Sequence, residues 1–172
     1  MFFLRKVAIV AIAVVTMSLA VNAQEQGDMA VGANLVLGYN SDFTDFGVGG
    51  KFLYNVSDAI RLEGAVTFFL PKDYFGVKLS FWDLSVNGHY LLPVSDKFTL
   101  YPLVGLGIQG WKLKVSESGI SVSDTGSDLC FNLGGGFDYK LTDQLFLNCE
   151  LKYRIVEDWN RLVISAGITY KF

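Results

Sequence analysis

Few side chains in this sequence could carry out chemistry. His89 is its only histidine, and as a general base it would need a nucleophile or an orienting carboxylate within reach. Glu63 and Glu150 could form a carboxylate pair, and Asp124 and Asp128, in or beside a serine- and glycine-rich stretch, could bind a cation. The chain has no phosphate-binding glycine loop, cysteine–histidine metal spacing or nucleophile elbow. We therefore predict no catalytic residue, no metal site and no cofactor.

All of these residues except Asp124 belong to stretches in which apolar and polar side chains alternate. Successive side chains of a strand point to opposite faces, so the alternation predicts strands with one apolar face. Eight stretches show it: residues 29–39, 46–56, 61–68, 82–90, 98–109, 128–139, 145–155 and 161–172. The chain is 51% hydrophobic, yet beyond its first residues no run approaches the roughly 18 apolar residues of a membrane helix. We predict an all-β fold, an eight-stranded antiparallel up-and-down transmembrane β-barrel.

The charged residues decide which face of each strand looks into the barrel. The apolar faces carry no charge, whereas the opposite faces carry Lys51, Arg61, Lys152, Arg154, Arg161, Lys171, Glu63, Asp83, Asp128, Asp138 and Glu150. A charge facing lipid costs about 2–4 kcal/mol at the bilayer midplane, so the apolar faces should contact lipid. We predict a salt-bridge network that fills the lumen, made by Lys51, Arg61, Glu63, Asp83, Glu150, Lys152 and Arg154. His89 should be a packed polar group of that lumen.

Three features need separate interpretation. The parity of the apolar residues changes at Phe81–Trp82, which predicts a β-bulge there. Pro102 removes a ladder donor, and we expect it close to the membrane surface, where water can serve the partner carbonyl. Cys130 should face inward and Cys149 outward, so we expect two free thiols.

The connections between the stretches are of two kinds. Residues 56–60, 94–98 and 141–145 share the order apolar, Ser or Thr, Asp, any residue, apolar, which favours tight turns. The other connections are residues 40–45, 70–76, 112–127 and 156–160, and residues 112–127 are the longest. Residues 121–123 could extend a hairpin there, but the flanking glycines and acidic residues favour a mobile loop. Glu117, Ile120 and Asp124 represent this candidate interaction loop.

Short periplasmic turns and longer outer loops are typical of outer-membrane barrels. An even number of strands then places both termini on the periplasmic side. Outward aromatic residues gather near both predicted boundaries, with Tyr54 and Tyr170 at one and Tyr39 and Trp82 at the other. Such aromatic belts mark the two interfaces of a membrane.

The first residues have the pattern of a secretory signal peptide. Arg5 and Lys6 precede a short apolar run, and a small residue, Ala23, ends the predicted segment. We predict a signal peptide over residues 1–23 and a barrel domain over residues 24–172. Two of the 14 basic residues leave with the peptide, so the mature chain has 12 basic against 17 acidic residues. This acidic balance excludes nucleic acid as a partner.

The last strand carries the most specific motif. Ile168, Tyr170 and Phe172 alternate up to a terminal Phe, which looks like the sorting signal read by the outer-membrane assembly machinery. With Tyr101-Pro102 and the glycine run 134–136, the chain resembles the small OmpA/OmpX-type outer-membrane barrels, here without a C-terminal peptidoglycan-binding domain. That resemblance implies the fold and the outer-membrane location. Its members act as adhesins, envelope structural proteins, and sometimes enzymes or weak pores.

Three function classes remain open at this point. A non-enzymatic envelope or surface-interaction protein would act through its outer loops on an unidentified extracellular partner, as a monomer in outer-membrane lipid. A narrow porin-like pore would need an open lumen, and eight strands leave room only for side chains. A soluble periplasmic lipocalin-like carrier would need an apolar lumen and a polar exterior, the inverse of this pattern. We therefore favour the first class.

Overall fold

The computed structural model describes residues 25–42, 44–74, 77–117, 120–157 and 160–172. The predicted signal peptide lies outside these residues. The chain forms β1 (Met29–Tyr39), β2 (Thr44–Asn55), β3 (Ile60–Phe69), β4 (Lys72–Tyr74), β5 (Val77–Tyr90), β6 (Leu92–Pro93), β7 (Phe98–Glu117), β8 (Ile120–Lys140), β9 (Leu145–Val156) and β10 (Arg161–Lys171). The described part contains no helix long and apolar enough to cross a membrane.

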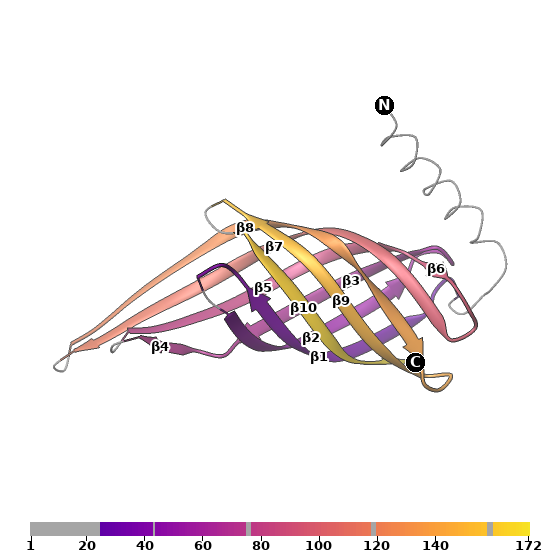
Figure 1. Cartoon of the computed structure of the whole chain (residues 1–172), viewed down its shortest axis with the longest axis horizontal. Helices are drawn as coiled ribbons and strands as arrows, with labels where there is room; N and C mark the ends of the chain where they lie inside the picture. The colour runs from indigo at the N-terminus through magenta and orange to yellow at the C-terminus, as the bar shows by residue number, and fades with distance from the viewer. Residues whose placement is uncertain (1–24, 43, 75–76, 118–119, 158–159) are drawn as a thin grey trace, which may run out of the picture.

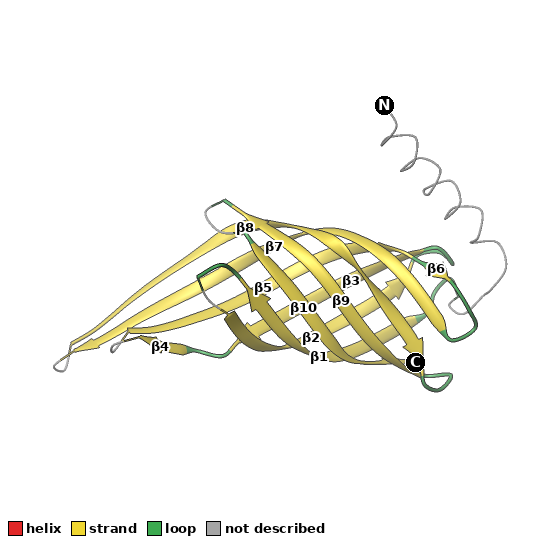
Figure 2. Cartoon of the chain, in the orientation of Figure 1, coloured by secondary structure: helices red, strands yellow, loops and turns green. Residues whose placement is uncertain are grey.

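Eight of these strands close into an antiparallel barrel, as predicted. Each of them pairs with its neighbour along the chain, β1 pairs with β10, and β5 pairs with β7 (Figure 1). The short strands β4 and β6 extend the edges of β5 and β7. The two ends of the barrel differ, because three short turns and the C-terminus lie at one end and the tall β7–β8 hairpin at the other (Figure 2). We call these the turn end and the hairpin end.

The three short turns are stabilised by the side chains that predicted them. The hydroxyl of Ser57 accepts a hydrogen bond from the backbone N–H of Ile60 at 3.0 Å. Thr142 accepts one from the N–H of Leu145 at 3.0 Å, and Ser95 accepts one from the N–H of Lys97 at 3.4 Å. A local oxygen thus satisfies a backbone donor at each reversal.

Burial follows the predicted parity around the barrel. The side chains of Asn87 and Arg154 point inward and are 0% exposed, whereas Leu35 and Leu129 on the outer face are 71% and 73% exposed. Cys130 is buried and Cys149 is half-buried on the opposite face of the strands, and both are free thiols, as the parity predicted.

The β7–β8 hairpin corrects the prediction that residues 112–127 form a loop. The ladder between these strands runs without interruption from the Phe98–Tyr139 pair to the Glu117–Ile120 pair, through the stretch predicted as a loop. The alternation of Lys112 and Lys114 with Trp111, Leu113 and Val115 extends the strand pattern past the glycines, and pairing on both arms outweighs their loop tendency. The 70–76 connection likewise contains a short strand, β4.

The predicted bulge at Phe81–Trp82 is wrong. β5 pairs with β7 in one continuous register from Val77 to His89. The irregularity lies on the other neighbour of β5, between β3 and β4. From the Phe68–Trp82 pair to the Lys72–Leu79 pair, the β3–β4 segment has one residue more than β5. Phe81 is only 5% exposed because it keeps the inward parity and packs among other apolar side chains inside the barrel.

Pro102 lies where a ladder is already interrupted. Pairing between β5 and β7 ends at His89–Leu103, and β6 resumes it at Leu92–Leu100. Among the described strands, the missing N–H of Pro102 therefore falls at a gap in the sheet. Its depth relative to the membrane surface stays a prediction.

Several glycines allow neighbouring backbones to approach closely on the inner face. A Cβ atom on Gly167 would lie 2.1 Å from the carbonyl oxygen of Ala33 and 2.6 Å from Cα of Asn34. On the outer face, by contrast, a Cβ on Gly64 would meet nothing within 4 Å. Gly167 thus permits the tight coiling of β1 against β10, while Gly64 does not have this role.

Gly167→Ala should therefore destabilise the barrel by about 1–3 kcal/mol, the usual cost of overpacking. In Gly64→Ala the added methyl group would point into open space, so the free energy of unfolding should change by less than about 0.5 kcal/mol. Urea titrations of protein refolded into lipid vesicles would measure both. Equal effects would contradict the assignment of inner and outer faces.

Candidate functional site

The centre of the lumen is organised around the ammonium group of Lys51. Its Nζ lies 2.7 Å from Oε1 of Glu150 and 3.3 Å from Oε2 of Glu63, and it also donates to Oδ1 of Asn148. Lys152 adds a second cation 3.5 Å from Glu150. Strands β2, β3 and β9 bring these residues together from across the barrel, so Lys51 bridges the two carboxylates and Lys152 adds a second cation beside Glu150.

A second group lies between this centre and the turn end. Nη1 of Arg61 contacts Oδ2 of Asp138 at 2.6 Å, and its Nε donates to Nδ1 of His89 at 3.2 Å. The guanidinium lies over the ring of Tyr101 at 4.6 Å, and His89 stacks on the same ring at 4.4 Å. The hydroxyl of Tyr101 donates to Glu150 at 3.0 Å, which joins the two groups.

A third group lies toward the hairpin end. Nη1 of Arg154 contacts Asp83 at 2.5 Å, and its Nε donates to Asn132 at 3.0 Å. Asn132 donates to Asn87, and Asn87 donates to Glu63 at 2.7 Å. The structure therefore places all seven charged residues of the predicted lumen network inside one hydrogen-bonded interior.

An apolar layer closes this interior at the hairpin end, and sequence reasoning missed it. Val36, Phe69, Phe81 and Val163 form a buried cluster, and Leu79 and Trp111 pack against it. The sequence contains a signal for this layer, because these apolar side chains lie on the strand faces that are otherwise polar. The bulge predicted at Phe81–Trp82 assigns Phe81 to the outer face instead.

Arg161 links this layer to the polar interior. Its guanidinium lies over the ring of Phe69 at 4.4 Å and donates to Gln109 at 2.7 Å. It also pairs with Asp45 at 3.6 Å, and Asp45 pairs with Lys72 of β4 at 3.1 Å. Asp45 and Gln109 were not predicted as part of the network, although their inward parity could have identified them.

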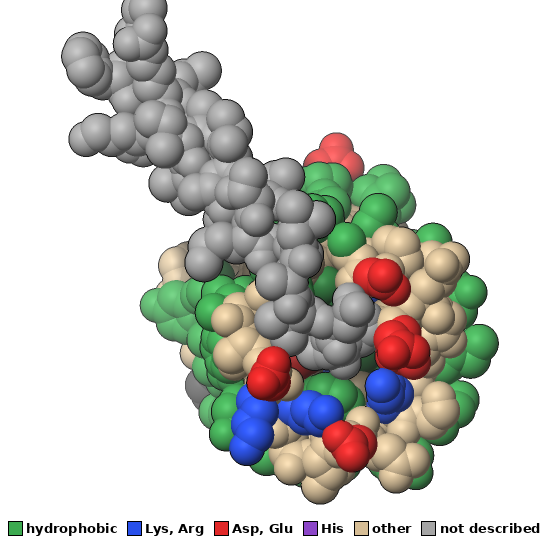
Figure 3. Space-filling view, turned by 90° about the vertical axis from the view of Figure 1, so that its right-hand side faces the viewer, with side chains coloured by type: hydrophobic (Ala, Val, Ile, Leu, Met, Phe, Trp, Pro, Cys, Tyr) green, Lys and Arg blue, Asp and Glu red, His purple; other side chains and the backbone are tan. Residues whose placement is uncertain are grey.

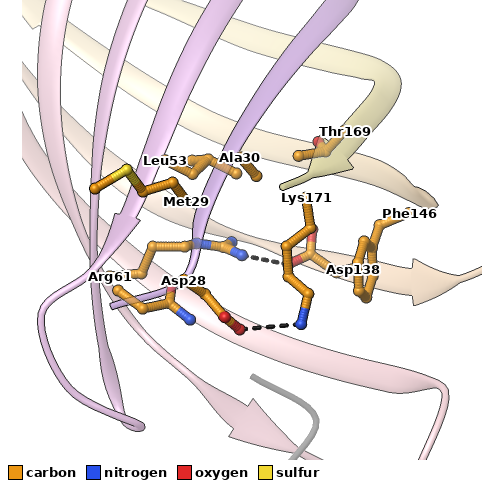
Figure 4. Close-up of a pocket in the computed structure, with 10 residues that line it drawn as sticks. Asp28, Met29, Ala30, Leu53, Arg61, Asp138, Phe146, Thr169 and Lys171 are labelled. Atoms are coloured by element: carbon orange, nitrogen blue, oxygen red, sulfur yellow. Dashed lines mark hydrogen bonds and ion pairs between the residues drawn. The ribbon is translucent and has the colours of Figure 1, made fainter. Parts of the chain in front are cut away.

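The turn end is closed by side chains as well. Figure 4 shows a pocket there, lined in part by Asp28, Arg61, Asp138, Phe146 and Lys171. Lys171 pairs with Asp28 at 3.1 Å across its mouth. The cavity volume is about 20 Å³, and a site needs roughly 10–15 Å³ to hold one water molecule. Solute-sized ligands therefore do not fit. Viewed from this end, acidic and basic side chains lie close together around the rim (Figure 3).

The buried charges are matched in number. Among the described residues they are Lys51, Arg61, Lys152, Arg154 and Arg161 against Asp45, Glu63, Asp83, Asp138 and Glu150. Unpaired charges in such an interior would be very costly, whereas paired and hydrogen-bonded ones are tolerated.

One cluster has the geometry of a metal site. Ligand atoms of Glu63, His89 and Glu150 lie within 4.8 Å of one another. The ammonium of Lys51, however, already lies between the two carboxylates and compensates their charge. A metal ion would have to displace this lysine, so the donor set fits a structural ion pair better than a metal site.

The remaining candidate residues lie outside the lumen. Ile168, Tyr170 and Phe172, in the predicted assembly signal, are 49%, 44% and 63% exposed on the outer face at the turn end. Glu117 and Ile120 form the last rung of the β7–β8 ladder, and Asp124 is exposed opposite Leu113. The structure thus places Glu117, Ile120 and Asp124 on the paired strands of a β-hairpin.

That hairpin belongs to a sheet that rises above the rest of the barrel. The sheet consists of β4, the first part of β5, the second part of β7 and the first part of β8 (Figure 1). We call it the protruding sheet. Pairing of β8 with β9 stops at Cys130–Val156, so within the described chain residues 120–129 have a strand neighbour only on the β7 side.

Comparisons with known proteins agree with this architecture. The family model described as outer membrane protein beta-barrel domain matches residues 7–172. No curated protein sequence matches the chain.

Among solved structures, the chain is similar to Ail, the attachment invasion locus protein of Yersinia pestis, with a TM-score of 0.59, 17% identity, and coverage of 86% of this chain and 99% of that one. It is also similar to the N-terminal β-barrel domain of Pseudomonas aeruginosa OprF (TM-score 0.55, 18% identity, coverage 87% and 100%). The third structure is P. aeruginosa OprG (TM-score 0.57, 13% identity, coverage 89% and 99%). Identities this low show the shared fold alone.

The central ion pairs lead to a stability prediction. Lys51→Met removes the cation between two buried carboxylates and should cost about 3–5 kcal/mol, the range for breaking a buried pair from one side. Lys51→Met combined with Glu63→Gln should recover part of this loss, because one uncompensated charge is also removed. Lys97→Met, in an exposed turn, should have an effect below about 0.5 kcal/mol. Denaturant titrations compare the three variants, and a single Lys51 variant as stable as the Lys97 control would contradict the network.

Proposed function

Because this chain belongs to the family of outer membrane protein β-barrel domains, we propose that it is a surface-interaction protein. It is an integral protein of the outer membrane. Its exposed apolar side chains, such as Leu35, Val86, Leu133 and Ile164, contact membrane lipid. The proposed partner-binding surface is the protruding sheet.

We further propose an orientation in the membrane and an assembly route for this chain. Residues 1–23 act as a cleaved signal peptide, and both termini and the three short turns face the periplasm. The protruding sheet then lies outside the cell. Ile168, Tyr170 and Phe172 are recognised by the outer-membrane assembly machinery. Exposed apolar residues occur on all eight barrel strands rather than on one side, which favours a monomer surrounded by lipid.

The interior supports a non-enzymatic and non-conducting role. His89 and the two central glutamates are buried, and the ion pairs with Lys51 already occupy the two carboxylates. A small-solute pore is disfavoured because an apolar layer and a charge network follow one another along the bore. A soluble carrier is disfavoured because the apolar face is the outer one.

The proposed interaction rests mainly on the edge of β8, where residues 120–129 pair with β7 alone among the described strands. An edge strand presents unpaired backbone N–H and C=O groups, to which an extended peptide can add as a further strand. At the base of this edge, a groove of about 440 Å³ is lined by Leu129, Phe131, Val156, Glu157 and Asn160, among others. Side chains of a partner strand could enter this groove. The name of Ail, an attachment protein, is consistent with such a role for a barrel of this shape.

Shortening the hairpin tests this proposal. Replacing residues 114–123 by Asn-Gly would join Leu113 to its ladder partner Asp124 through a tight turn without changing the register. The variant should still fold, shown by a heat-modifiable gel shift, because no strand of the barrel itself is cut. It should lose binding to any extracellular protein that the full chain captures from a panel of matrix and serum proteins.

A matched control replaces Ser41 and Asp42, exposed in the β1–β2 connection, by glycine. This variant should bind as the unaltered chain does. Binding that survives the shortened hairpin but not the control would move the interaction surface to the β1–β2 connection, at the same end of the barrel.

A further inference from the structure

A lateral groove lies on the outer wall of the barrel where β3 separates from β5. The β3–β5 ladder ends at Phe68–Trp82, and β4 rejoins β5 only at Leu79. The interruption beside Ser80 and Phe81 leaves a groove of about 460 Å³. Ligand sites commonly have volumes of about 300–1,000 Å³, so the groove is large enough for a headgroup and the adjoining part of an acyl chain.

The outer face changes character from rung to rung along this groove. The rung of Val66, Leu84, Ile108 and Leu129 is entirely apolar and belongs to the lipid-facing band. The next outward-facing rung contains Phe68, Trp82, Gly110 and Ser127, and the one after it contains Ser80, Lys112 and Thr125. Successive outward rungs are about 6.6–6.8 Å apart, so aliphatic, aromatic and cationic surfaces follow one another as the layers of a bilayer leaflet do.

The aromatic rings of Phe68 and Trp82 form the floor of the groove, and Gly110 leaves room for the ring of Trp82. A Cβ atom on Gly110 would lie 2.2 Å from the indole of Trp82, so this ring lies directly on the glycine backbone. Trp82 remains 40% exposed and Phe68 58% exposed. Both rings therefore present a preformed apolar floor next to the exposed polar groups of Lys112, Thr125 and Ser127.

The cationic side of the groove continues up the protruding sheet. Lys78 of β5 lies directly opposite Lys114 of β7, one outward rung beyond Lys112, and all three are exposed. Like charges directly opposite in a sheet destabilise it. Among the described residues near the groove, the strand register places one acidic residue on this face. It is Asp73 of β4, which lies opposite Lys78. Two positive charges remain in excess on a chain whose net charge is −3, so an anion would complement this surface.

We propose that the lateral groove binds the phosphate-bearing headgroup of a membrane lipid. The lipid's acyl chain lies against Phe68 and Trp82, and its phosphate accepts hydrogen bonds from Lys112, with Lys78 and Lys114 adding charge. A lipid is favoured over a free anion because the groove is continuous with the band that already contacts lipid. The inference rests on the proposed function only for the leaflet, which is the outer one if the termini are periplasmic.

Native mass spectrometry of the refolded full chain tests the proposal. Detergent micelles would contain equimolar phosphatidic acid and phosphatidylcholine with identical acyl chains, and the ratio of the two retained lipids is the readout. A lysine at an anionic surface contributes about fivefold, or about 1 kcal/mol, to binding. The double variant Lys78→Gln/Lys112→Gln should therefore reduce the preference for phosphatidic acid by up to about 25-fold.

The control is Lys97→Gln/Lys140→Gln, which removes the same charge at the turn end and should retain the preference. Equal retention of the two lipids by the unaltered chain, or equal losses in both double variants, would overturn the proposal. If inorganic phosphate displaced the bound lipid as effectively as short-chain phosphatidic acid does, the groove would be a site for phosphate and not for a lipid. Because micelles impose no orientation and contain no partner, failure here is distinguishable from failure of the proposed surface interaction.

Discussion

A strand that crosses a bilayer finds no water for its backbone groups, and closure of the sheet through the β1–β10 and β5–β7 ladders is the constraint on which the rest of this structure depends. Closure forces each strand to show one face to lipid and the other to a narrow interior. The outer face is therefore apolar, as at Leu35 and Leu133. The inner face must be filled by side chains, and glycines such as Gly167 let neighbouring strands approach closely enough for the barrel to coil tightly.

The narrow interior has an electrostatic consequence. Each charge that points inward is removed from water and must meet an opposite charge from another strand. Lys51 meets Glu63 and Glu150, and Arg154 meets Asp83. These ion pairs compensate the buried charges and also fill the interior. The apolar layer around Phe69 and Phe81 closes the interior at the hairpin end. A barrel built in this way has its free recognition surfaces outside the bore, on the protruding sheet and on the outer wall.

Much of the fold could be predicted from the sequence, because a period of two residues is visible without any knowledge of long-range contacts. The same parity placed His89, Cys130 and the seven network residues on the inner face, but it could not say which carboxylate meets which cation, since that depends on the register between distant strands. Prediction was wrong where local composition was weighed above parity. Glycine and serine suggested a loop where Lys112 and Leu113 continue a strand, and Phe81 was interpreted as a bulge because an apolar layer inside the barrel was not expected. The lateral groove could not be anticipated, because it arises from the ladder interruption between β3 and β4.

We expect the interior to be a packed, charge-paired core and not a passage. Current through planar bilayers that contain the refolded full chain tests it most directly. We expect no steady conductance above that of the bare bilayer, because the ion pairs of Lys51 and the layer around Phe81 obstruct the bore at successive levels. A reproducible steady channel whose conductance changes in the Glu150→Gln variant would contradict it.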